Sequence, residues 1–238
     1  MQTIDFAIIL GKNQVKNNNH VVTIFTKNYG IQTVFVSAGT KKKTVKSAVL
    51  QPLSICQVKY SKTKTSNLLK LQEARIETPL LNIQVDVYKS AIALFIADFL
   101  SHVLPQDSED GFYDFIENSL KIFNEIEEGK SNYHLLFLLK ISKWLGLQPT
   151  LNNGNNNFFD LKEGIFFSQQ PSHPYYLSIE ETNIIGQLLV MEWTDIGKVK
   201  LTGIMRRKLV NSIIHYYVFH IPGFKKPKAL TILEEVFD

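Results

Sequence analysis

Hydrophobic and polar residues alternate along the first 80 positions of the chain, where β-branched residues are also frequent. Alternation with a period of two is typical of strands that bury one face. Five segments carry this pattern, and polar or glycine-containing stretches separate them. The predicted strands are residues 3–10, 21–26, 31–37, 53–60 and 69–76. No helix long enough to connect parallel strands intervenes, so we predict a small antiparallel barrel of the five-stranded OB type.

After residue 84 the hydrophobic period changes to 3.6, which is the period of helices with one buried face. The predicted helices span residues 88–104, 112–126 and 135–145, one that begins at Ser178, and then 203–221 and 228–237. The helix at 135–145 is apolar on nearly all sides, which predicts a central position. Ser178 and Glu181 have the spacing of a capping box. Residues 146–176 show no clear period.

The fold class predicted from these patterns is α+β. An N-terminal five-stranded OB-type barrel, residues 1–80, is expected to be a nucleic-acid-binding domain. A C-terminal all-helical domain, residues 81–238, is expected to follow it directly, because no linker rich in proline or serine separates the two patterns.

The charge changes at the same place as the hydrophobic pattern. The whole chain of 238 residues has a net charge of +4, but residues 1–80 alone carry +9 and residues 81–238 carry −5. A basic block joined to an acidic remainder indicates that the first third binds a polyanion. The alternative, that the lysines only keep a small β domain soluble, stays open on charge alone.

Several classes of protein are excluded or disfavoured. The single cysteine, Cys56, excludes a disulfide framework, and we expect it to be a small buried residue. Residues 1–5 do not begin a secretory signal, and the longest apolar stretch, 91–100, is too short to span a bilayer. We therefore expect a cytoplasmic protein without membrane contact.

A search for catalytic constellations gives no candidate. The sequence contains neither a glycine-rich phosphate loop before a helix nor a Gly-x-Ser-x-Gly elbow. His215 and His220 are five residues apart, which does not place them on one helical face. The carboxylate runs at 125–128 and 234–235 are typical of solvated helix ends. We therefore predict no enzyme activity, no catalytic residue, no cofactor and no metal.

The barrel loops contain better candidates for a functional site. Proteins that bind single strands combine a positive groove with aromatic rings on which bases stack. Phe25 and Phe35 are mid-strand and more typical of a core, whereas Tyr29 and Tyr60 lie at a turn and beside lysines. We predict that Tyr29 and Tyr60 stack on bases. The lysines expected to contact phosphates are Lys12, Lys16, Lys41, Lys42, Lys43, Lys46 and Lys64. Arg206 and Arg207, with Lys208, either extend this track or form an ordinary solvated face.

The chain resembles the RecO family at several points. Val22–Gly30 reads Val-x-Ile-Phe-Thr-x-x-Tyr-Gly, and a lysine-rich loop and Leu50-Gln-Pro-Leu53 follow it, as in the family's N-terminal barrel. Three later segments resemble its helical domain: Lys89–Phe95, Trp144–Pro149 and Tyr216–Phe224. Many members carry a four-cysteine zinc motif where this chain has residues 151–157, so the resemblance is to a zinc-free branch in which hydrogen bonds and packing hold that region.

The resemblance implies a function and, with it, a cytoplasmic protein that is associated with the nucleoid. RecO-like proteins bind single-stranded DNA that is coated by the single-strand-binding protein SSB, anneal complementary strands and, with RecR, help load RecA. The expected partners are thus single- and double-stranded DNA, RecR and the acidic C-terminal tail of SSB, with the chain itself a monomer. Lys140, Lys143 and Trp144 are the predicted site for that tail. Two alternatives remain: a module that binds RNA or only protein, and a nuclease or other phosphotransferase, which the single acidic residue within positions 1–72, Asp5, disfavours.

Overall fold

The computed structural model describes residues 2–37, 47–63, 68–106, 110–151 and 157–237. The chain forms two compact units, Met1–Asn124 and Glu125–Asp238, and each is considered by itself. The first unit contains the barrel and three helices, and the second contains the remaining helices and a small sheet. The change from strand to helix falls near residue 80, as expected, while the proposed domain boundary at that residue stays a prediction.

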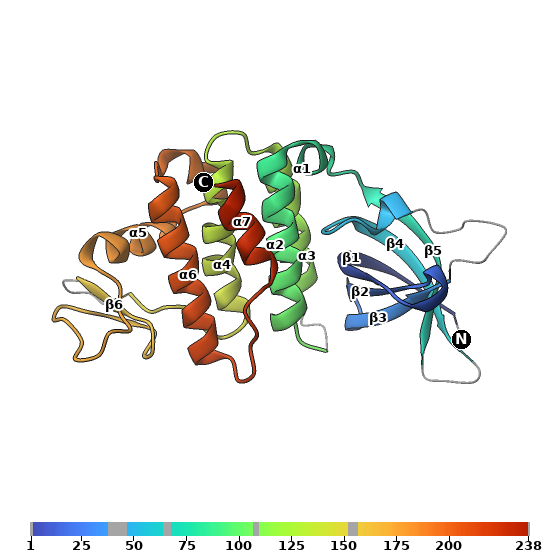
Figure 1. The fold of residues 1–238 in the computed structure, drawn as a ribbon, viewed down its shortest axis with the longest axis horizontal. Helices are drawn as coiled ribbons and strands as arrows, with labels where there is room; N and C mark the ends of the chain where they lie inside the picture. Colours follow the sequence, from blue (N-terminus) through green and yellow to red (C-terminus); the bar gives the residue numbers. More distant parts are fainter. Residues whose placement is uncertain (1, 38–46, 64–67, 107–109, 152–156, 238) are drawn as a thin grey trace. The chain divides into compact units, whose positions relative to one another are not determined.

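The first five strands form a closed barrel in the order β1-β2-β3-β5-β4 (Figure 1). Their bounds are β1 Gln2–Gln14, β2 His20–Thr26, β3 Gly30–Val36, β4 Ile55–Lys62 and β5 Leu69–Thr78. Neighbouring strands pair antiparallel except β3 and β5, which pair in parallel. The predicted five-stranded OB-type barrel is confirmed, with this single parallel pairing as an exception to the antiparallel pattern.

The period-two pattern produces the barrel core. Val22 and Ile24 on β2 and Val34 on β3 are fully buried inside the barrel, and the alternate residues of these strands point outward. Cys56 belongs to the same core, as the sequence predicts. Its thiol lies 3.6 Å from the carbonyl oxygen of Val49, and burial raises the pKa of Cys56 to about 12.

Three helices complete the first unit: α1 Leu81–Val85, α2 Val87–Val103 and α3 Phe112–Glu125. The second and third match the predicted helices closely. The side chain of Asp86 caps α2 by accepting the Lys89 N–H at 3.0 Å. The side-chain oxygen of Asn124, at the end of α3, accepts the N–H groups of Asn82 and Ile83 at the start of α1. These bonds satisfy donors that a helix start leaves without an intrahelical partner.

The second unit is mostly helical. Its helices are α4 Tyr133–Trp144, α5 Ile179–Val190, α6 Gly203–His220 and α7 Ala229–Val236, with 3-10 turns at Lys130–Asn132 and Trp193–Lys198. Residues 133–139 of α4 are all buried, as expected for a central helix. The capping box of Ser178 and Glu181 is present at the start of α5.

A small two-stranded sheet lies within this helical unit and is an addition to the predicted fold. It pairs β6 Phe158–Asp160 with β7 Ile165–Phe167 (Figure 1). Strands of three residues are too short to show a period in the sequence, which is why they were not predicted.

Polar contacts hold the segment that follows Pro149, as the sequence analysis expects of a zinc-free chain. The buried carboxylate of Asp160 accepts the N–H groups of Lys162 at 2.8 Å and Glu163 at 3.1 Å. Its other oxygen lies 3.0 Å from Nε2 of His173. Among the residues that the structure describes, no three His, Cys, Asp or Glu side chains gather in a way that could hold a metal ion. The expected absence of a metal stays a prediction.

A helix that spans a membrane must be both long and apolar. Within the described ranges, none of the helices combines the length and the apolar character that crossing a bilayer requires.

Candidate nucleic-acid interface

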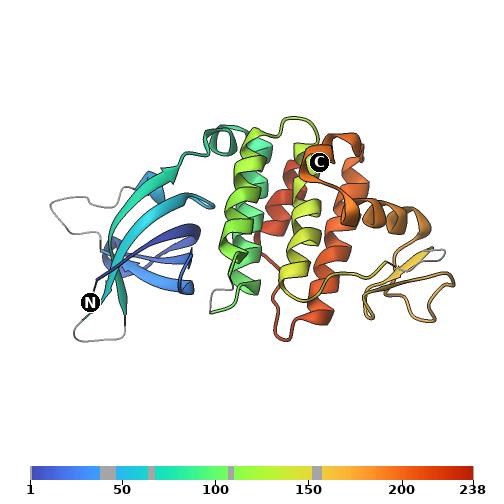
Figure 2. The same ribbon diagram turned by 180° about the vertical axis from the view of Figure 1, so that it is seen from behind.

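The two ends of the barrel differ in which connections they carry. Gln14 of β1 pairs with His20 of β2, and His20 pairs with Val36 of β3. The β1–β2 connection and the end of β3 therefore lie at the same edge, which we call the loop end. The turn between β2 and β3, residues 27–29, lies at the opposite edge of these strands, which we call the turn end (Figure 2). Strands of seven residues separate the two by about 20 Å.

Two rows of paired residues cross the strands at the loop end. In the first row, Lys12 pairs with Val22, Val22 with Val34, Val34 with Leu69 and Leu69 with Lys62. In the second row, Val21 pairs with Phe35, and Phe35 with Lys70. The pairings thus bring lysines from β1, β4 and β5 to the end of the barrel from which the β1–β2 connection projects.

Phe35 is an outward-facing aromatic residue at the loop end. Its neighbours along β3, Val34 and Val36, point into the barrel core, so the pleat turns Phe35 to the outer face. The side chain is half-buried, with Val21 on one side and Lys70 on the other. The sequence analysis favoured a core position for Phe35, and the alternation Val34-Phe35-Val36 was the signal that could have corrected it.

Lys12 and Lys16 are exposed at the loop end. Lys16 begins a 3-10 turn, Lys16–Asn18, in which Asn17 and Asn18 have φ of 61° and 58°. Asparagine tolerates this left-handed region better than most residues, so the chain reverses within a few positions. The Val15 N–H donates to the Asn19 carbonyl at 2.8 Å and closes the turn.

Five of the predicted phosphate contacts lie outside the described residues: Lys41, Lys42, Lys43, Lys46 and Lys64. The strand ends that precede them, Val36 of β3 and Lys62 of β4, are at the loop end. The first four follow the end of β3 at Val36. Lys64 follows Thr63, whose N–H donates to the Leu68 carbonyl at 3.0 Å where β4 and β5 are joined.

Tyr29 lies at the turn end, so the structure does not bring it together with Lys12 and Lys16. Its side chain is 51% exposed. Its N–H donates to Oγ1 of Thr26 at 3.1 Å, and its carbonyl accepts from the Gln32 amide at 2.6 Å. These bonds fix the backbone of the turn and leave the ring in solvent. The predicted stacking of Tyr29 on a base is untested, and its position away from Lys12 and Lys16 argues against it.

The assignment of Tyr60 to base stacking is corrected. Tyr60 is 4% exposed and belongs to the core inside the barrel. Burial, with smaller contributions from Asp5 and Tyr29, raises the pKa of its phenol to about 12. A ring enclosed by the barrel has no free face for a base, and the position of Tyr60 on the inward side of β4 is the physical reason.

Helix α3 covers the outer face of the β2–β3 hairpin at the turn end. Phe25 points outward from β2 but is fully buried, because the rings of Phe112 and Tyr113 pack on it with centroids 5.9 Å away. The Ile31 N–H of β3 donates to the Pro105 carbonyl at 3.3 Å. OB folds bind oligonucleotides on the face of strands 2 and 3. Among the described residues, α3 covers this face at the turn end, while Phe35 at the loop end is half-buried.

The contacts of Arg206 favour a structural role over a place in a DNA track. Its Nε donates to Oδ1 of Asn132 at 2.9 Å, and its Nη2 donates to the Leu201 carbonyl at 3.1 Å. The guanidinium carbon lies 4.8 Å from the ring centroid of Phe237. Arg207 is half-buried on the same helix, and its predicted contact with DNA stays untested.

The predicted site for an acidic tail lies at the end of α4. Lys140, Lys143 and Trp144 are spaced so that they share one face of this helix. Lys143 is exposed, and Trp144 is half-buried. Nζ of Lys140 lies 5.6 Å from the ring centroid of Trp193, which stacks on Tyr133. Trp193 is thus a further aromatic residue beside this face. The sequence analysis missed it because it is far from α4 along the chain.

Comparisons with known proteins cover nearly the whole chain. The family model "Recombination protein O N terminal" matches residues 1–80, and "Recombination protein O C terminal" matches residues 84–229. The chain is 32% identical to the DNA repair protein RecO of Flavobacterium psychrophilum over 100% of both chains. It is 31% identical to the DNA repair protein RecO of Phocaeicola vulgatus over 97% of both chains. The resemblance seen in the sequence is therefore confirmed, and the chain belongs to the RecO family of DNA repair proteins.

Proposed function

We propose that this chain is a non-enzymatic recombination mediator that binds and anneals single-stranded DNA and, with RecR, helps load RecA on SSB-coated DNA. Membership of the RecO family supports a role in DNA repair and recombination. Annealing requires that the repulsion between two phosphate backbones be neutralised without preference for sequence, and lysine side chains supply this.

The observation that carries the proposal is the composition of the loop end. It combines an outward aromatic ring, Phe35, with a lysine from the next strand, Lys70. Lys12, Lys16 and Lys62 are exposed at the same end of the barrel. This pairing of stacking surface and positive charge is what proteins use to bind single strands without reading their sequence. The lysines at 41–43, 46 and 64 add charge to connections that start from the same end.

The same lysines support binding of double-stranded DNA. Contacts to phosphates are available on a duplex as well as on a single strand, whereas stacking on Phe35 requires unpaired bases. We therefore propose that the chain binds both forms through the loop end and that Phe35 favours the single strand.

The SSB tail is proposed to bind at the end of α4. An acidic peptide with an apolar end needs apolar rings flanked by positive charge. Lys140, Lys143 and Trp144 provide these on one helix face, and Trp193 lies next to Lys140. Fluorescence titration with an acidic peptide that ends in an aromatic residue tests this, with Trp144→Ala expected to weaken binding at least fivefold. Equal affinity of the variant would remove the site from α4.

The experiment that tests the proposed function compares the wild type with a variant in which Lys41, Lys42, Lys43 and Lys46 are alanine. Two readouts are needed: the affinity for a fluorescent oligonucleotide across a salt series, and the rate at which complementary strands anneal. Up to four lost phosphate contacts would lower the slope of log affinity against log salt by up to about 3 units. Annealing should slow in the same variant, because both activities use the same charge.

Two results would support the alternatives. Stronger binding to RNA than to DNA, or no nucleic-acid binding at all, would favour a module for RNA or protein. Cleavage of labelled DNA in the presence of Mg²⁺ would favour a nuclease. Unchanged binding and annealing in the lysine variant would remove that segment from the interface.

A further inference from the structure

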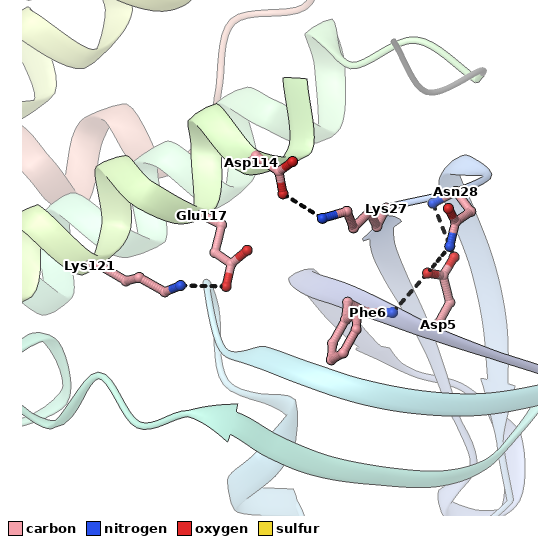
Figure 3. Close-up of polar contacts among 7 residues, drawn as sticks. All are labelled: Asp5, Phe6, Lys27, Asn28, Asp114, Glu117 and Lys121. Atoms are coloured by element: carbon pink, nitrogen blue, oxygen red, sulfur yellow. Dashed lines mark hydrogen bonds and ion pairs between the residues drawn. The ribbon is translucent and has the colours of Figure 1, made fainter. Parts of the chain in front are cut away.

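The acidic helix α3 lies against the barrel at the turn end, and its Asp114 forms an ion pair with Lys27 of the β2–β3 turn. Nζ of Lys27 lies 2.7 Å from Oδ1 of Asp114, in the first turn of α3 (Figure 3). The two side chains are 43% and 47% exposed, so the pair faces solvent. Lys27 is the residue of the β2–β3 turn whose charge a nucleic acid crossing the hairpin would meet.

The backbone that carries Lys27 is held in place. Asp5 is 3% exposed, and its carboxylate accepts the N–H of Phe6 at 2.8 Å, the N–H of Asn28 at 3.2 Å and the side-chain amide of Asn28 at 2.7 Å. The Lys27 N–H donates to the Phe6 carbonyl at 2.9 Å. Figure 3 shows the bonds from Phe6 and Asn28 to the Asp5 carboxylate on the barrel side of the ion pair. The anchor of Lys27 is therefore fixed, and only its side chain can turn toward another anion.

The surroundings of Lys27 are rich in carboxylates. Besides Asp114, Glu117 follows three residues later on α3 and binds Lys121 at 2.7 Å. The hydrogen bond to Asp114 is the largest cause that raises the pKa of Lys27, and the negative charges nearby act in the same direction. Nζ also lies 5.9 Å from the ring centroid of Tyr113. A phosphate that approached this lysine would have to displace Asp114 or lie beside it.

We propose that Asp114 ends the phosphate track of the barrel by neutralising Lys27 and repelling the nucleic-acid backbone. The strand of DNA then crosses the loop end and does not continue along the β2–β3 hairpin to α3. This inference rests on the proposed function, because it concerns where the bound nucleic acid stops. An exposed ion pair contributes little to stability, so its removal leaves the fold intact.

The test uses Asp114→Asn, Lys27→Gln and the double variant, each titrated with a fluorescent single strand across a salt series. In the wild type, Lys27 makes no phosphate contact, so Lys27→Gln alone changes affinity less than twofold. Asp114→Asn releases Lys27, which should raise the salt slope by about 0.7 and affinity about 3- to 10-fold at low salt. The double variant should return to the wild-type slope, because the released lysine is gone.

Glu117→Gln is the matched control. It removes one negative charge from the same helix and releases Lys121, which is on α3 and not on the barrel. An equal gain for Glu117→Gln and Asp114→Asn would show that only the net charge of α3 matters, and would overturn the inference. So would a loss of affinity in Lys27→Gln, which would place Lys27 in the track already. A wild-type chain that binds no oligonucleotide would overturn the proposed function as well, so the two failures are distinguishable.

Discussion

Phe25 and Phe35 lie on the same hairpin, and both point outward from the barrel, yet they differ in how far they are buried. Phe25, near the turn end, is fully buried under Phe112 and Tyr113 of α3. Phe35, at the loop end, is half-buried between Val21 and Lys70. The difference comes from α3, which covers one half of the outer face and leaves the other half open. One hairpin thus provides both a contact between the barrel and α3 and the surface proposed to bind DNA.

This comparison separates stability from binding. Apart from Asp114, whose substitution is proposed to release Lys27, substitutions at the turn end should change the free energy of unfolding and leave the salt dependence of DNA binding unchanged. Substitutions at the loop end should do the reverse.

The largest effect is expected at the contact between β2 and α3. Phe25→Ala removes a fully buried ring and should lower the free energy of unfolding by about 3–5 kcal/mol, measured by urea denaturation. Phe35→Ala is the matched control on the same hairpin, and it should cost much less because its ring is half-exposed. Equal costs would show that α3 does not distinguish the two ends.

The second largest effect on the free energy of unfolding is expected at Asp5. Asp5→Ala leaves three donors of the turn end without the buried carboxylate that they share, which should cost about 1–3 kcal/mol in the free energy of unfolding. The variant should bind oligonucleotide with the wild-type salt slope, provided that it is folded at the assay temperature. A changed slope in a folded variant would place the turn end in the interface.

Aromatic stacking gives the third comparison. Phe35→Ala should weaken binding of a single strand by about 1–3 kcal/mol, because one stacked base is lost, while binding of duplex changes less. Tyr29→Ala removes a more exposed ring from the turn end and should change the affinity for a single strand less than threefold. A larger loss for Tyr29→Ala than for Phe35→Ala would reverse the assignment of the two ends.

Single lysines should show the smallest effects. Lys70→Gln should lower the salt slope for a single strand by about 0.7, since it removes one phosphate contact at the loop end. Lys59→Gln is a useful control because Lys59 is also on the barrel, 3.7 Å from Glu73, and should leave the slope unchanged. The same loss for both lysines would indicate that the barrel attracts DNA by its total charge.

The sequence predicted the architecture better than the interface. The period-two and 3.6 patterns located all five barrel strands and the long helices, because burial of one face imposes those periods directly. The sheet of β6 and β7 was not predicted, because its strands have three residues each. Charge asymmetry pointed to the barrel, and the lysines at 12 and 16 are indeed exposed there.

Stacking residues could not be chosen from the sequence in the same way. Tyr60 follows a lysine by one position, yet the pleat turns it into the core. Phe35 and Phe25 read alike along the chain, and only α3, some eighty residues later, buries one of them. Such differences depend on tertiary contacts, which local composition does not record.

The central claim is that DNA binds at the loop end, and the most direct measurement is the salt dependence of oligonucleotide binding for two matched variants. One replaces four loop-end lysines with glutamine: Lys12, Lys16, Lys62 and Lys70. The other replaces four exposed lysines of the second unit: Lys200, Lys225, Lys226 and Lys228. Both lose the same charge. We predict that the first loses about 2–3 units of slope and most of its affinity while the second keeps the wild-type slope. Equal losses in the two variants would contradict the claim.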